Sequence, residues 1–118
     1  MSDPASISCV EIERAAVGQP GESAIMVHQH SESGQKLAVL RNEQSNLCQN
    51  TGAVGILVVN GQPVAQGDLT EVGSSIEARV STGDVLAAVV HTIPKLNGVV
   101  CVTLGELTAV LQECDAGY

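Results

Sequence analysis

The sequence predicts an all-β domain, and three observations lead to this prediction. Short apolar runs alternate with polar residues at a period of two, as strands with one buried face require. Turns containing Gly and Asn separate these runs. The apolar residues are mostly aliphatic, with 17 Val, 10 Leu and 6 Ile in 118 residues. We expect a small β-barrel or β-sandwich of seven to eight short strands with a short C-terminal helix, as a single domain over residues 1–118.

The first half of the chain contains four strand candidates. The clearest alternates strictly between two faces, with Ile25 and Val27 on one side and His28 and His30 on the other. The polar segment Asn42–Gly52 is predicted to be a long loop, a kind of segment that often carries function. The candidates, in order, are Ile7–Arg14, Ala24–His30, Lys36–Arg41 and Ala53–Val59.

The second half begins with the best hairpin signal in the chain, Asn60-Gly61, because both residues adopt positive φ at low cost. The returning strand, Pro63–Gln66, is predicted to lie at a sheet edge, since Pro cannot donate to a ladder. The later candidates are the half-buried strand Ser75–Val80, the central strand Val85–Thr92, and Val99–Leu104.

The period changes near the C-terminus. Leu107, Val110, Leu111 and Cys114 follow the spacing i, i+3, i+4, i+7, which places them on one face of a helix. Gly117 is suited to ending that helix. We therefore expect the single helix of the domain here.

Charge and aromatic content exclude nucleic-acid binding. Five Lys and Arg face 13 Asp and Glu, a net charge of -8, so no basic phosphate-binding surface is expected. Tyr118 is the only aromatic residue, which leaves no platform for stacking bases. The longest apolar run, Val85–Val90, is too short to span a membrane, so no membrane partner is expected.

The four cysteines, Cys9, Cys48, Cys101 and Cys114, form no Cys-x-x-Cys pair, which argues against a zinc knuckle or a redox motif. They are sufficient for two disulfides. Because the first residues show no secretory signal, we expect free thiols and a cytoplasmic protein, or one assembled in the cytoplasm.

His28 and His30 form the one pattern that points to a metal. On a strand their imidazoles project from the same face, and His91 on another strand is a candidate third ligand for Zn, Cu or Ni. The competing interpretation makes His28 and His30 solvated residues near a strand end and His91 the end of a core strand. No acidic residue clusters with them in the sequence.

Enzyme motifs are absent from the sequence. It contains no Gly-x-Ser-x-Gly elbow and no phosphate-binding loop. The carboxylates of interest are interpreted as solvated or turn-forming residues: Glu11 with Glu13, Asp68 with Glu71, and Asp84. We therefore expect no catalysis and no cofactor.

Two segments, Ser33-Gly-Gln-Lys-Leu and Gly52-Ala-Val-Gly-Ile-Leu-Val, resemble the head-decoration (cement) proteins of lambda-type tailed phages. In that family a Lys-Leu strand precedes an Ala-Val-Gly-Ile-Leu strand, and Leu96-Asn-Gly98-Val99 is similar to a later turn. The resemblance covers about half of the chain. It implies a β-rich protein that is locked as an oligomer onto a capsid.

The leading hypothesis is a non-enzymatic structural protein that binds other protein subunits, as a homo-oligomer or on a shell protein, and stabilises a shell or tube in a virion. The low charge content, 15%, favours this hypothesis because neutral surfaces suit subunit contacts. The second hypothesis is a small β-domain that binds a metal or ligand through His28, His30 and His91. The third is a small enzyme with a Cys or His centre.

Overall fold

The computed structural model describes residues 8–18, 21–47, 51–94 and 106–116, and it places eight β-strands and no helix among them. The all-β prediction and the number of strands are confirmed. The strands are β1 (Cys9–Val17), β2 (Ser23–Gln29), β3 (Lys36–Ser45), β4 (Thr51–Val59), β5 (Gln62–Asp68), β6 (Ser75–Val80), β7 (Val85–Pro94) and β8 (Leu107–Asp115).

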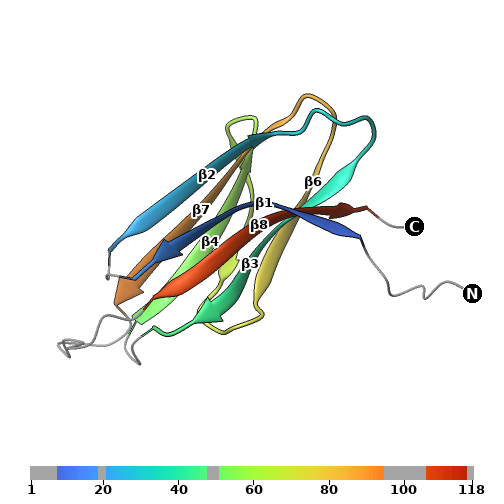
Figure 1. The fold of residues 1–118 in the computed structure, drawn as a ribbon. Helices are drawn as coiled ribbons and strands as arrows, with labels where there is room; N and C mark the ends of the chain where they lie inside the picture. The colour runs from blue at the N-terminus through green and yellow to red at the C-terminus, as the bar shows by residue number, and fades with distance from the viewer. Residues whose placement is uncertain (1–7, 19–20, 48–50, 95–105, 117–118) are drawn as a thin grey trace, which may run out of the picture.

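The strands form two four-stranded sheets that pack as layers (Figure 1). Sheet A has the order β1-β8-β3-β6, and sheet B has the order β2-β7-β4-β5. All neighbouring strands are antiparallel. The two sheets are separate, so the molecule is a sandwich, and the barrel alternative is wrong.

The strand pairing is nested. β4 pairs with β5, β3 with β6, β2 with β7, and β1 with β8. The chain therefore runs out and back as one long folded ribbon, with successive strand pairs assigned to alternate sheets. This topology is that of an eight-stranded jelly roll.

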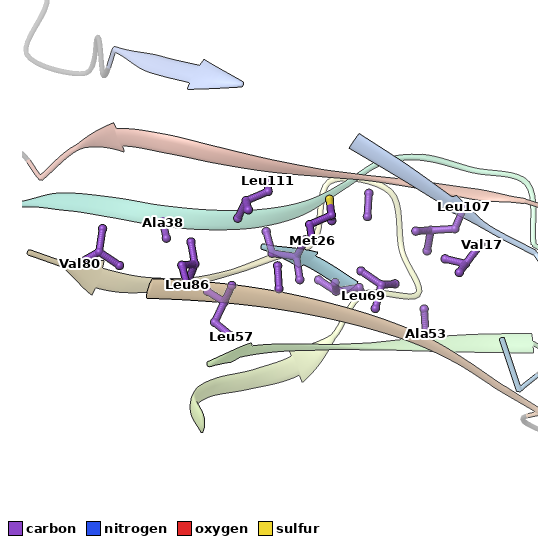
Figure 2. Close-up of a cluster of buried hydrophobic side chains, with 14 residues drawn as sticks. Val17, Met26, Ala38, Ala53, Leu57, Leu69, Val80, Leu86, Leu107 and Leu111 are labelled. Atoms are coloured by element: carbon purple, nitrogen blue, oxygen red, sulfur yellow. The ribbon is translucent and has the colours of Figure 1, made fainter. Parts of the chain in front are cut away.

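The core between the sheets is aliphatic (Figure 2). Strands of both sheets contribute completely buried leucines, including Leu40 and Leu111 from sheet A and Leu57 and Leu86 from sheet B. Packing of these branched side chains takes the place of Phe and Trp, which the sequence lacks.

Three features of sheet B confirm the sequence analysis. Asn60 and Gly61 have φ of 50° and 82°, so they form a turn with positive φ at both central residues. β5, which contains Pro63, lies at the edge of the sheet. β7 lies between β2 and β4 and is central.

The predicted C-terminal helix is wrong, because its residues form strand β8. Leu107 and Leu111 point into the core, whereas Val110 and Cys114 are buried on the other face. β8 lies between β1 and β3, and its neighbours cover that outer face: Val110 is opposite Arg14 and Arg41, and Cys114 is opposite Cys9. A strand buried on both faces loses its alternation, and the mixture of two faces imitated a helical spacing.

The predicted loop Asn42–Gly52 is also largely strand, since β3 continues to Ser45 and β4 begins at Thr51. Asn42 is completely buried, and its side-chain Nδ2 donates a hydrogen bond to the Leu69 carbonyl oxygen at 2.8 Å. Asn42 is therefore a polar residue at a core position, bonded through Nδ2, while its buried Oδ1 accepts no hydrogen bond within the described residues. The predicted strand Val99–Leu104 lies outside the described residues.

The prediction of free thiols is wrong for two of the four cysteines. Cys9 of β1 and Cys114 of β8 stand opposite each other in the ladder and form a disulfide, with Cα atoms 4.0 Å apart. Cys48 and Cys101 lie outside the described residues. The bond ties the first strand to the last, across a sequence separation of 105 residues.

Candidate functional site

Two histidines from sheet B meet a carboxylate from sheet A inside the sandwich. His28 lies in β2 and His30 directly follows it, and both lie on the same face, as the period-two pattern predicts. That face points into the sandwich, so the interpretation as solvated residues is wrong for His30, which is completely buried. Their ring nitrogens approach Oε2 of Glu113 in β8, His30 Nδ1 at 2.9 Å and His28 Nε2 at 3.4 Å. We call these three residues the histidine–carboxylate cluster.

His30 is held rigidly in this cluster. Its side chain is completely buried, and its backbone N–H and carbonyl bond to Asp84 and Gly83. Its Nε2 is 2.9 Å from the Gly34 carbonyl oxygen, which can only accept a hydrogen bond. Nε2 therefore carries a proton, and Nδ1 faces Glu113.

A small cavity of about 140 Å³ opens beside the cluster. Lys36 stands at its wall, and its Nζ forms an ion pair with Asp115 at 2.8 Å. The hydrogen bond and the charge of Asp115 raise the pKa of Lys36 above its ordinary value. The cavity is lined by Val10, Ile12, His28, Ser31, Glu32, Lys36 and Glu113.

His91 does not join the other two histidines. Its register partner in β2 is Ser23, whereas His28 pairs with Leu86, so five residues of strand separate them. At about 3.4 Å per residue this is roughly 17 Å. The Nδ1 atom of His91 instead forms a hydrogen bond with Ser23 Oγ at 2.5 Å.

Glu113 is the member of the cluster that sequence reasoning missed. The helical assignment of 107–114 removed it from consideration. Read at a period of two, Glu113 is in phase with the core residues Leu107, Ala109 and Leu111. An acidic residue at a core position of a strand was the signal, since such groups are rarely buried without a partner.

The other candidate carboxylates stabilise turns and surface pairs, as interpreted from the sequence. Asp84 accepts hydrogen bonds from the Ser81 backbone at 2.8 Å and the Asn60 side chain at 2.9 Å. Asp68 accepts one from the Thr70 backbone at 2.8 Å. Glu11 pairs with Arg14, and a β-bulge separates it from Glu13.

A second candidate site is the outward face of sheet B. Its side chains alternate with core residues such as Met26, Leu57 and Leu86 and point away from sheet A. Ile25, Val27 and Val85 are 64%, 61% and 44% exposed. We call this surface the aliphatic face; it consists of Ile25, Val27, Val54, Ile56, Val58, Val85, Ala87 and Val89.

The register aligns this face in rows across the sheet. Val89 is opposite Ile25 on one side and Ile56 on the other, and the next row joins Val27, Ala87 and Val58. The three strands β2, β7 and β4 contain no Asp, Glu, Lys or Arg, and β5 contains Asp68 alone.

Sheet A carries the charge that sheet B lacks. On its outer surface Arg14 bridges Glu11 at 2.7 Å and Glu43 at 3.2 Å. Hydrogen bonding to Arg14 lowers the pKa of Glu11 from its ordinary value. The charged residues in its strands are Glu11, Glu13, Arg14, Lys36, Arg41, Glu43, Glu77, Arg79, Glu113 and Asp115. The two sheets therefore present opposite kinds of surface to their surroundings.

No family model, curated protein or solved structure matches this chain. The resemblance to head-decoration proteins therefore stays a prediction. Among the residues that the structure describes, no helix has the length and apolar character needed to cross a membrane.

Proposed function

We propose that this protein is a non-enzymatic structural protein that assembles with other protein subunits through the aliphatic face. The observation that carries the proposal is the segregation of charge: sheet A holds nearly all charged strand residues, and the outward side chains at the centre of β2, β7 and β4 form uncharged aliphatic rows. Contact with water alone does not require the absence of charged residues from β2, β4 and β7. Contiguous exposed apolar surface of this kind is typical of interaction sites.

The partner that fits this face is a second copy of the same chain. A chain with a net charge of -8 repels its copies wherever charged surfaces meet. The aliphatic face avoids this repulsion, and two flat sheets pack face to face at about 10 Å. Burial of each exposed Val or Ile on this face contributes roughly 1–2 kcal/mol. A two-fold contact would satisfy both copies at once.

In its finer form the proposal is a capsid-decoration role in a virion. The resemblance of 33–37 and 52–58 to phage head-decoration proteins supports it. Jelly rolls are also common among viral capsid domains, an argument from fold-level analogy. The Cys9–Cys114 disulfide suits an oxidising location such as a virion surface better than the cytoplasm.

The test compares two glutamate variants by native mass spectrometry and light scattering. Val27→Glu places a carboxylate in the aliphatic face, and Val72→Glu places one on the β5–β6 connection, where the native valine is equally exposed at 61%. We expect a wild-type oligomer that Val72→Glu preserves. Val27→Glu should weaken association about a hundredfold, because an unpaired charge would be buried at a cost of about 3 kcal/mol or more.

Two results would contradict the proposal. One is a wild-type protein that remains monomeric at high micromolar concentration. The other is an oligomer that Val27→Glu and Val72→Glu weaken equally, since that would reflect added charge and not loss of this face.

A further inference from the structure

The buried contact between His30 and Glu113 brings two acceptors together. With its Nε2 proton directed at Gly34, a neutral His30 presents the lone pair of Nδ1 to Glu113 Oε2, 2.9 Å away. Two lone pairs at that distance repel unless a cation or a proton lies between them. Neither atom has a hydrogen bond of acceptable geometry within the described structure, and both are buried. The pair is therefore a preformed position for a positive charge.

His28 supplies a third atom with a lone pair, a possible metal ligand, on the same side of the cluster. Its Nε2 is 3.4 Å from the same Glu113 oxygen, and its side chain is 26% exposed toward the cavity. Two bonds of about 2.1 Å at a tetrahedral angle place donor atoms about 3.4 Å apart. The 3.4 Å separation between His28 Nε2 and Glu113 Oε2 equals that value, and the 2.9 Å separation between His30 Nδ1 and the same oxygen is shorter. The Gly34 carbonyl also holds the distal N–H of His30, as outer partners of metal-bound histidines usually do.

We propose that His28 Nε2, His30 Nδ1 and Glu113 Oε2 bind one divalent transition-metal ion of the Zn²⁺ class. Two imidazoles and a carboxylate are donors that Zn²⁺ accepts readily. The ion would link sheet B, through the end of β2, to sheet A, through β8. Its remaining coordination position would face the cavity of about 140 Å³ and take water or a small ligand.

Binding requires a rearrangement of one side chain. In the part of the chain that the structure describes, no three His, Cys, Asp or Glu residues already stand in a metal-holding arrangement. His30 and Glu113 are fixed by burial, so His28 is the ligand that closes onto the ion. Its partial exposure leaves the ring room to turn. The site therefore differs from one built on the three histidines, because Glu113 replaces the distant His91.

The test measures Zn²⁺ binding to untagged, disulfide-intact protein by isothermal titration calorimetry and native mass spectrometry after chelator treatment. We expect one Zn²⁺ per chain and a raised melting temperature in its presence. His28→Ala should weaken binding at least about tenfold. His91→Ala is the matched control, since it removes a partly buried histidine hydrogen-bonded far from the cluster, and it should leave affinity unchanged.

Three results would overturn the proposal: absence of Zn²⁺ binding by the wild type, full binding by His28→Ala, or equal losses in His28→Ala and His91→Ala. Glu113→Gln adds a second check, because it preserves the shape of the side chain and removes its charge. If Glu113→Gln does not fold, the His28 and His91 variants still decide the result. The proposal is independent of assembly through the aliphatic face, and oligomeric state does not enter the test.

Discussion

Gly55 shows how single residues set the spacing of the core. A Cβ at this position would lie 2.4 Å from Cδ1 of Leu69 and 3.1 Å from Cδ2 of Leu40. Both leucines are completely buried, so neither side chain can move away freely. The absence of a side chain in β4 therefore allows Leu69, from the β5–β6 connection, to enter the space between the sheets.

We expect Gly55→Ala to lower the free energy of unfolding by about 1–3 kcal/mol through overpacking, measured by urea denaturation. Gly67→Ala provides a graded comparison. There the new Cβ would meet only Cγ2 of Ile76, at 2.7 Å, and Ile76 is less buried and lies in the edge strand β6. Equal losses in the two variants would contradict this account of the core.

Asp84 gives the stability of the protein a dependence on pH. The Ser81 backbone N–H, and secondarily the Asn60 side chain, hold the pKa of Asp84 below its ordinary value of 3.8. A carboxyl group whose pKa is lowered by folding stabilises the protein above its unfolded pKa, and this stabilisation is lost as pH falls through the folded pKa.

We therefore expect Asp84→Asn to be less stable than the wild type at neutral pH, with the difference shrinking between about pH 5 and pH 2. Urea denaturation across this range measures it. Glu77→Gln, which removes one exposed carboxylate from β6, controls for the change in net charge. A difference for Asp84→Asn that stays constant with pH would contradict the assignment.

At the scale of elements, the disulfide compensates for the weak position of β1. This strand lies at the edge of sheet A, and most of its residues are exposed. Its ladder with β8 is interrupted by a bulge between Glu11 and Glu13. The Cys9–Cys114 bond holds the far end of this strand in register.

We expect the double variant Cys9→Ser/Cys114→Ser to lose about 2–4 kcal/mol of unfolding free energy, because the bond closes a long loop. The two single variants should each cost nearly as much as the double, since either one removes the same bond. Urea denaturation under non-oxidising conditions compares the three. Additive losses in the single variants would contradict the pairing.

Elements could be predicted from the sequence where one face of a strand meets water. β6 alternates Ile76, Ala78 and Val80 with exposed residues, and the prediction for Ser75–Val80 matched it. β8 could not be predicted this way, because one of its faces lies in the core between the sheets and side chains of its two sheet neighbours cover the other. The same limit applied to the candidate site. The sequence pattern showed that His28 and His30 share a face, whereas Glu113 was missed because it lies in β8.

At the scale of the whole molecule, the sandwich separates two surfaces of different composition. Charged residues are concentrated on sheet A, and the aliphatic face of sheet B is the surface through which we propose that the protein assembles. The strand sequences already differ in their content of charged residues. Which strands share a sheet, however, depends on pairing between segments far apart in the sequence. Local patterns do not reveal which of two sheets a strand joins.

The nested pairing also determines the order in which strand pairs become complete as the chain is synthesised. β4 and β5 are joined by the Asn60-Gly61 turn, so no later segment is needed to bring them together. Among the strands that the structure describes, β1 is synthesised first, whereas its sheet neighbour β8 is synthesised last. The Cys9–Cys114 bond therefore cannot form until nearly the whole of this stretch of chain has been synthesised. Once formed, that bond holds β8, the last of these strands, beside β1.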